Sequence, residues 1–175
     1  MKRPSMYPHH ESSLKKFTDL FNKQRDGLSL VMQIYQTENY RDDGVIVDTR
    51  TGKRITFDWE KRDRYFKSGK FRFPTLWQFE RKIKKDEIGL SLQCDSNETA
   101  VLVAWHRDWL KEPMKTRRLL TDGPGKETAQ VRETRHFKIY LYSEMDRFRR
   151  MLVRALKTGR FDHSVFPDAE GYTED

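Results

Sequence analysis

Residues 43–62 constrain the fold most, because they hold two strand patterns joined by a short turn. Residues 44–48 contain an unbroken β-branched run, and residues 54–62 alternate between apolar and polar side chains. A period of two is typical of a strand with one buried face. Gly52 lies between the two patterns and tolerates the positive φ of a tight turn. The sequence therefore predicts a β-hairpin.

The alternation divides the second strand of this hairpin into two faces. One face carries Ile55, Phe57, Trp59 and Lys61, and the other carries Thr56, Asp58, Glu60 and Arg62. Asp58 and Glu60 are two residues apart, so they lie about 6–7 Å apart along one face. Asp43 stands at the start of the first strand and is placed to join them. The hairpin thus predicts a cluster of three carboxylates.

Three further segments have helical spacing. The first carries Leu14, Phe17, Leu20 and Phe21, with Ser12 or Ser13 as its N-cap. The second covers residues 76–85 behind Thr75, and the third covers residues 144–158 behind Ser143, with Gly159 at its end. Each apolar stripe is interpreted as a buried helix face.

Strand patterns account for most of the remaining chain. Residues 86–94 and 99–106 alternate and predict a second antiparallel hairpin, and residues 137–142 predict a last strand. Residues 28–35 fit either a helix or a buried strand, and residues 107–110 fit a helical turn. Residues 111–135 have few core candidates and a turn signal at 122–125, which favours a mobile loop.

These elements predict an α/β (α+β) fold with a mixed, mostly antiparallel sheet of about five strands flanked by helices. The chain has 175 residues, enough for one domain with a core. Charged residues make up 35% of it, but 13% aromatic residues supply the buried area that a disordered chain lacks. We expect a single domain over residues 1–161 and an acidic tail over residues 162–175.

Charge favours a polyanionic partner. The formal net charge is +8, although the tail holds five acidic residues and no Lys or Arg. So basic a body predicts contact with nucleic acid, either DNA or RNA; a generic basic surface is the alternative. The arginines best placed for phosphate contact are Arg117, Arg118, Arg147, Arg150 and Arg154. The tail has the opposite sign, which suggests that it folds back over this surface.

The chain has one cysteine, Cys94, which excludes an internal disulfide and fits a reducing compartment. No apolar run approaches the ~20 residues that span a bilayer, and no signal-peptide pattern opens the chain. We therefore expect a cytoplasmic protein without a membrane partner.

The carboxylate cluster suits a hard divalent cation, because Mg²⁺ prefers oxygen ligands and assists phosphodiester hydrolysis. Residues 38–62 also resemble the PD-(D/E)XK nuclease superfamily. In that family an Asp opens one strand, and an acidic-x-Lys triplet lies on the next, paired strand. Asp43 matches the first feature and Asp58-Trp59-Glu60 the second, although the triplet ends in Glu and Asp42 stands where the family has Pro.

The resemblance implies Mg²⁺ or Mn²⁺ held by Asp43, Asp58 and Glu60. It also implies a catalytic lysine from elsewhere in the chain. Lys82 fits this role better than Lys61, which points to the other strand face. The family's upstream helical glutamate would be Glu38 or Glu11. A helix, β-hairpin, helix and strand in this order also look like the family core.

Other functions fit the same sequence. His106, Asp108 and His136 lie at predicted strand ends and suggest a transition-metal site or an acid–base pair. A non-catalytic protein that binds DNA or RNA needs only the basic surface. A phage-type inhibitor that occupies another protein's nucleic-acid channel, or a structural subunit with a protein partner, is a further alternative.

Overall fold

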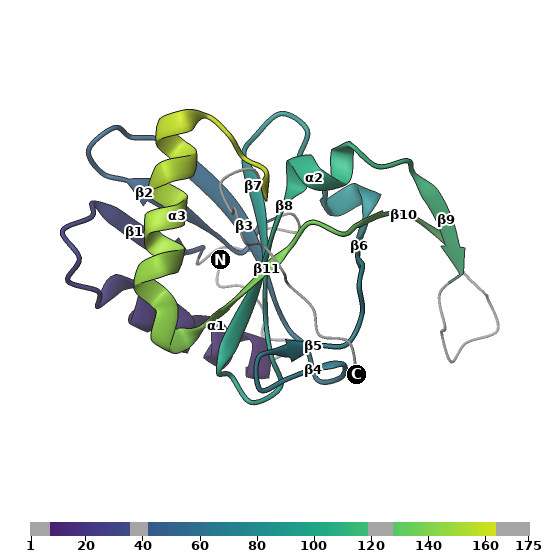
Figure 1. Cartoon of the computed structure of the whole chain (residues 1–175), viewed down its shortest axis with the longest axis horizontal. Coiled ribbons are helices and arrows are strands. Elements are labelled where there is room, and N and C mark those ends of the chain that lie inside the picture. Colours follow the sequence, from purple (N-terminus) through teal and green to yellow (C-terminus); the bar gives the residue numbers. More distant parts are fainter. Residues whose placement is uncertain (1–7, 36–41, 119–127, 164–175) are drawn as a thin grey trace.

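The computed structural model describes residues 8–35, 42–118 and 128–163, and a six-stranded sheet lies at its centre (Figure 1). In spatial order its strands are β1 (Leu30–Ile34), β2 (Gly44–Asp48), β3 (Arg54–Lys61), β7 (Gly89–Cys94), β8 (Ala100–Trp105) and β11 (Lys138–Leu141). β3 and β7 are parallel, and the other neighbours are antiparallel. The predicted fold class is confirmed, with six strands in this sheet.

The predicted hairpin of β2 and β3 has the expected register. Val45 pairs with Thr56 and Ile46 with Ile55, and Gly52 in the turn has φ 75°. Ile55, Phe57 and Trp59 are buried on what we call the first face of the sheet. The second face carries Thr56, Asp58 and Glu60. The second predicted hairpin, β7 and β8, also pairs antiparallel as expected.

Helices α1 (Pro8–Asn22) and α3 (Met145–Thr158) cover the first face. Phe17 of α1 packs against Trp59, with ring centroids 5.0 Å apart, and against Phe148 of α3 at 5.9 Å. The predicted stripes of α1 and α3 are therefore buried, apart from the partly buried Leu20. Burial of this aromatic cluster supplies much of the hydrophobic stabilisation of the fold.

Smaller elements lie on the side of the second face, and most of them cover it. They are the hairpin β4 (Phe66–Lys67) and β5 (Lys70–Phe71), the strand β6 (Leu76–Phe79) with the 3₁₀ turn η1 (Glu80–Lys82), the helix α2 (His106–Leu110), and the strands β9 (Lys115–Arg118) and β10 (Thr128–Thr134). β6, β10 and β9 form a second sheet in that order. Leu76, Trp109 and Phe137 belong to the core on this side. Figure 1 shows β9 and β10 extending from the body, and we call them the β9–β10 arm.

The helix predicted over residues 76–85 is wrong. Leu76 pairs with Thr134 and Gln78 with Arg132, so the segment begins as a strand and ends in η1. The mobile loop expected over residues 111–135 is wrong where β9 and β10 form, while residues 119–127 lie outside the described residues. Two pairings explain these errors: β6 pairs with β10, which is far away in sequence, and β9 pairs with the other side of β10.

The N-caps predicted for the first and last helices are wrong, whereas Gly159 ends α3 as predicted, with φ 69°. α1 begins at Pro8, so Ser13 lies inside it, where its hydroxyl accepts a hydrogen bond from Trp59 Nε1 at 2.9 Å. Ser143 lies in the 3₁₀ turn η2 (Tyr142–Glu144) that precedes α3. The Glu144 carboxylate accepts from the Leu141 amide at 3.1 Å instead. The open choice for residues 28–35 is resolved as the strand β1.

Arg149 of α3 forms hydrogen bonds with α1, with β1 and with the chain between them. Its side chain is 2% exposed, and Nε donates to the Asp26 carboxylate at 2.7 Å. Nη1 donates to the carbonyls of Phe21 and Leu30, and Nη2 donates to that of Leu28. The hydrogen bonds from Arg149 hold the pKa of Asp26 below its usual value. One guanidinium therefore joins α3 to the chain between α1 and β1.

We expect Arg149→Met to lower the free energy of unfolding by about 3–5 kcal/mol in urea denaturation, because it leaves a carboxylate and three carbonyls without their donor. Arg150→Met is the matched control, since Arg150 is 64% exposed and, within the described part of the chain, forms an ion pair with Asp146 on the same helix. Its expected effect is below about 1 kcal/mol. Equal effects of the two variants would contradict this role of Arg149.

Candidate active site on the second face

Asp58 lies in the middle of β3, between the central sheet and β6, and its side chain is 13% exposed. Gln78 of β6 donates from Nε2 to Asp58 Oδ2 at 3.3 Å. Ser91 is the register partner of Asp58 on the parallel strand β7, and its hydroxyl donates to the Asp58 carboxylate. Three strands therefore hold this carboxylate in place.

Asp43 reaches the same part of β3 from the start of β2. Its backbone amide donates to the Phe57 carbonyl at 2.8 Å, and its Oδ2 accepts from the Trp59 amide at 2.7 Å. The Asp43 side chain thereby extends the hydrogen bonding between β2 and β3 by one residue. Its partner Trp59 lies between Asp58 and Glu60 in the sequence. Asp43 is 8% exposed, whereas Glu60 is exposed.

Burial raises the pKa of Asp58 to about 7, from an ordinary value of 3.8. The negative charges of Asp43 and Glu60 raise it further. Donation from Ser91 and the positive charge of Lys82 act in the opposite direction. Catalytic carboxyl groups commonly titrate near neutral pH in polar sites of this kind.

His106, the first residue of α2, faces Asp58 from the other side. Its Nδ1 accepts a hydrogen bond from the Lys84 amide at 3.0 Å, so in the neutral ring the proton is on Nε2. Nε2 is 3.8 Å from Asp58 Oδ2 and has no hydrogen-bond partner among the described residues. Burial, followed by the charge of Lys84, lowers the pKa of His106 to about 3. The imidazole is therefore neutral and presents its N–H to Asp58.

The three nearby lysines have different positions. Lys82, at the end of η1, is near enough to Asp58 for its charge to lower the pKa of that carboxyl. Lys84 pairs with Asp42, with Nζ 2.6 Å from Oδ1. Lys61 points to the first-face side, as the alternation predicts, and its Nζ lies 3.3 Å from Glu98 Oε2. Of the two lysines considered from the sequence, the structure brings Lys82 to the site.

We use the name Asp58 cluster for Asp43, Asp58, Glu60, Gln78, Lys82, Ser91 and His106. In the part of the chain that the structure describes, no group of three or more His, Cys, Asp or Glu side chains is arranged to hold a metal ion. Nor does any helix there have the length and apolar character to cross a membrane.

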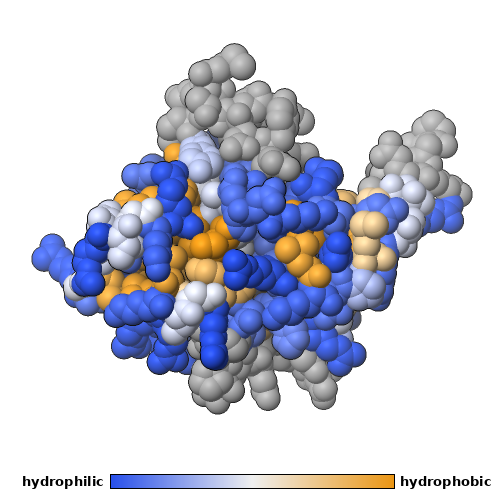
Figure 2. Space-filling model, turned by 90° about the horizontal axis from the view of Figure 1, so that it is seen from above, coloured by the Kyte–Doolittle hydropathy of each residue, from blue (hydrophilic) through white to orange (hydrophobic). Residues whose placement is uncertain are grey.

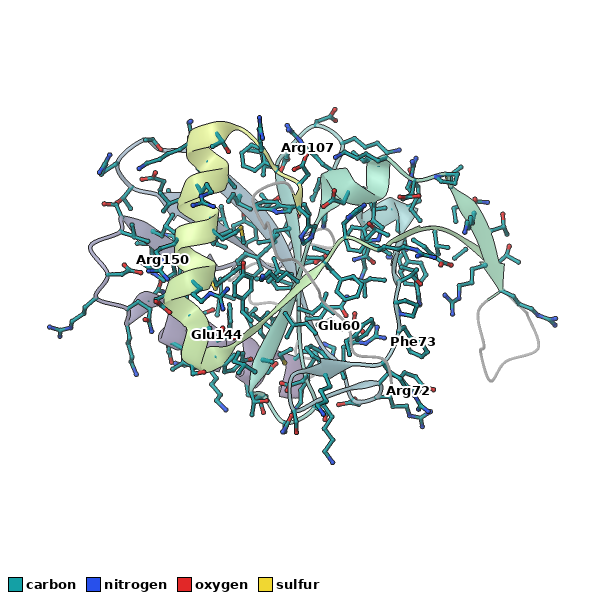
Figure 3. The ribbon with its side chains drawn as sticks, viewed as in Figure 1. Glu60, Arg72, Phe73, Arg107, Glu144 and Arg150 are labelled. Carbon is teal, nitrogen blue, oxygen red and sulfur yellow. The ribbon has the colours of Figure 1, made fainter. Side chains whose placement is uncertain are left out.

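The predicted phosphate-binding arginines fall into two groups. Arg147, Arg150 and Arg154 are exposed on α3, which covers the face opposite to Asp58. Arg147 pairs with Glu144 at 2.6 Å and Arg150 with Asp146 at 3.3 Å. Figure 3 shows Arg150 and Glu144 on one side of the sheet and Glu60 on the other. A strand bound along α3 would therefore not pass over the Asp58 cluster.

Arg117 and Arg118 form the second group, on the β9–β10 arm. Both are exposed, and the Arg117 guanidinium lies 4.7 Å from the Trp77 ring centroid. The arm belongs to the sheet that packs on the second face, on the same side as Asp58.

From above, the surface of the molecule is mostly hydrophilic, with hydrophobic side chains in small patches (Figure 2).

The alternative histidine site is divided by the structure. His106 joins the Asp58 cluster, whereas His136 stacks on His163 with ring centroids 6.2 Å apart. His163 Nε2 lies 3.7 Å from Asp108 Oδ2. For the upstream glutamate, Glu11 is exposed on α1, which covers the first face, and Glu38 lies outside the described residues.

Sequence reasoning missed Gln78, Ser91 and the pairing of His106 with Asp58. A signal for Gln78 exists, because it is the one polar residue in the apolar run 76–79. Ser91 becomes a partner of Asp58 only through the parallel register of β3 and β7. Comparisons with family models, curated proteins and solved structures found no match to this chain.

The raised pKa of Asp58 predicts a pH-dependent effect of Asp58→Asn. The folded-state pKa exceeds the unfolded value, so the stability from this group is present below about pH 4 and is lost as pH rises through 7. Asn cannot ionise, so the variant should gain about 2–4 kcal/mol relative to wild type between pH 4 and 8.

Urea denaturation of both proteins across this range measures the difference. Asp19→Asn is the control, since it removes an exposed carboxylate of α1, and its difference from wild type should vary by less than about 0.5 kcal/mol. If Asp58→Asn gives an equally flat difference, the carboxyl group is not held in a raised-pKa environment.

Proposed function

We propose that the protein is a nuclease that hydrolyses phosphodiester bonds with Mg²⁺ or Mn²⁺, and that the Asp58 cluster is its active site. The observation that carries the proposal is the environment of Asp58. A buried carboxyl with a pKa of about 7 lies within electrostatic reach of two further carboxylates and of Lys82. A basic chain with such a site has both the charge to attract a polyanion and the groups to act on it.

The donors suit the chemistry of a hard cation. Mg²⁺ typically takes one or two protein carboxylates, and water and substrate phosphate complete its ligands. Asp43, Asp58 and Glu60 offer such oxygens, and a cation would offset the burial, and with it the repulsion from Asp43 and Glu60, that raises the pKa of Asp58. Mg²⁺ therefore needs fewer protein ligands than the preformed group of three that the described residues lack. When bound, the ion would polarise the phosphate and favour deprotonation of a water molecule.

The chain's own residues have complementary roles. Gln78 and Ser91 donate to Asp58 and fix its orientation. The Nε2 atom of the neutral His106 lies 3.8 Å from Asp58 Oδ2, beyond hydrogen-bond distance, at the edge of the same site. Lys82 brings a positive charge beside Asp58, where it would stabilise the negative charge that develops on the phosphoryl oxygens during hydrolysis.

The order of elements supports the nuclease resemblance in part. α1 precedes the β2–β3 hairpin, with Asp43 before one strand and Asp58 on the next. The chain then returns to place β7 beside β3. The second helix of the family core is absent, and the chain from β4 to η1 makes this connection instead.

A non-catalytic nucleic-acid-binding protein is the second candidate. The observation that favours it is the β9–β10 arm, where Lys115, Arg117 and Arg118 are exposed on a strand that extends from the body. Such an arm could grip a phosphate backbone without any reaction at Asp58. The two candidates differ in whether bound nucleic acid is cut.

We expect the wild-type protein to cut single- or double-stranded DNA or RNA with Mg²⁺ or Mn²⁺, and not with a chelator. Asp58→Asn and Asp43→Asn should each reduce the cleavage rate by at least about 100-fold, because each removes a proposed ligand. Asp19→Asn, on the opposite face, should cut at the wild-type rate. Gel assays of end-labelled substrates measure these rates.

Thermal unfolding gives a readout that does not depend on activity. Mg²⁺ should raise the melting temperature of the wild type and of Asp19→Asn, but not that of Asp58→Asn. Undiminished cleavage by Asp58→Asn would disprove the assignment of the site. Binding without cleavage by the wild type would favour the non-catalytic candidate.

A further inference from the structure

Two aromatic rings are exposed to water at the base of the β4–β5 hairpin, which packs on the second face through Phe66 and Phe71. Tyr65 is 46% exposed and Phe73 is 40% exposed, and their ring centroids are 5.0 Å apart at an interplanar angle of 63°. Several large hydrophobic side chains are exposed among the described residues, and Tyr65 and Phe73 are the aromatic ones. A paired, exposed aromatic surface of this kind is typical of a binding site.

The rings are held by a rigid support. Tyr65 directly precedes β4, and Phe73 follows β5 by two residues. The Arg72 amide donates to the Tyr65 carbonyl at 2.9 Å, which closes the base of this hairpin. Beneath the outer pair, Phe71 contacts Phe73 at 5.9 Å and is itself buried against Phe66 and Phe137. The core therefore fixes the place at which the outer rings meet solvent.

Positive charge surrounds the pair. Residues 62–73 contain five basic side chains, Arg62, Arg64, Lys67, Lys70 and Arg72, and one acidic residue, Asp63. All of the basic side chains except Arg62 are exposed, and the Arg72 guanidinium lies 5.9 Å from the Tyr65 ring centroid. Exposed rings that stack on bases, together with cations that contact phosphates, are the combination by which proteins bind single-stranded nucleic acid.

We propose that Tyr65, Phe73 and Arg72 form a docking surface for unpaired bases, so that the substrate of the Asp58 cluster is single-stranded nucleic acid. A duplex keeps its bases stacked inside and cannot offer their faces to these rings. An acidic peptide would use the cations but has no need of the rings. The β4–β5 hairpin packs through Phe66 and Phe71 on the second face, which also carries Asp58 and Glu60, and Figure 3 shows Phe73 and Arg72 close together and away from Arg150. The inference rests on the proposed function for its choice of substrate.

The test measures binding without cleavage. Fluorescence anisotropy of a labelled 20-nucleotide single strand and of its duplex, with a chelator present, gives the affinity of each variant. Tyr65→Leu and Phe73→Leu keep an apolar side chain but remove the ring. Each should weaken single-strand binding roughly five- to 100-fold and leave duplex binding within about twofold of wild type.

Two controls separate ring stacking from general effects. Val31→Ala removes exposed apolar surface on β1, and Arg25→Gln removes an exposed charge between α1 and β1. We expect each to change single-strand affinity by less than about twofold, and Arg72→Gln to weaken it by more than Arg25→Gln does. Thermal unfolding of every variant identifies any that fails to fold. If a ring variant fails to fold, Arg72→Lys is measured in its place. Lys keeps the positive charge but lacks the planar group that stacks, so this variant should still weaken single-strand binding.

The outcomes distinguish this inference from the proposed function. If both ring variants bind single strands as the wild type does, the docking surface is wrong, even when the protein cuts DNA or RNA in an Asp58-dependent reaction. If the rings are required for single-strand binding but no cleavage occurs, the surface stands and the nuclease proposal fails. Equal losses for single strand and duplex would assign a role to the charges alone and overturn the stacking proposal.

Discussion

The burial of one carboxyl group, that of Asp58, is the constraint on which the second face of the sheet depends. A carboxylate removed from water needs donors or positive charge to remain ionised. The chain provides Gln78, Ser91 and Lys82, while Asp43 and Glu60 act against ionisation. The result is a group that gains or loses its proton near neutral pH. Such an arrangement reduces stability, and proteins commonly retain it where a function requires it.

The two faces of the central sheet have different physical roles. The first face buries a continuous aromatic and aliphatic core under α1 and α3, and Arg149 joins these elements through hydrogen bonds. The second face has its own apolar core over β8, but over β3 and β7 it carries Asp58, Ser91 and Gln93. The stable face thus supports a polar site on the reverse side of the same strands. The parallel pairing of β3 and β7 places Ser91 opposite Asp58.

Local patterns were sufficient to predict the β2–β3 hairpin, its two faces and the apolar stripes of α1 and α3. The alternation also placed Lys61 away from Asp58. The sequence does not reveal β6, because its partner β10 lies more than 50 residues later in the chain. In a segment as short as the four residues of β6, strand pairing with β10 outweighs the helical spacing of its apolar residues. The α3 arginines were selected by charge alone, and charge does not reveal which face of a sheet a helix covers. No sequence pattern distinguishes Tyr65 and Phe73 from Phe66 and Phe71, and only the structure shows that the first two are exposed and the last two are buried.

The most direct test of this account is a titration of the Asp58 carboxyl carbon by NMR, with and without Mg²⁺. Assignment is made by comparison with Asp58→Asn. The account predicts a pKa of about 7 without the metal and a clear decrease when Mg²⁺ is added, because a nearby cation stabilises the ionised form. A pKa near the ordinary 3.8, or one that Mg²⁺ leaves unchanged, would contradict it.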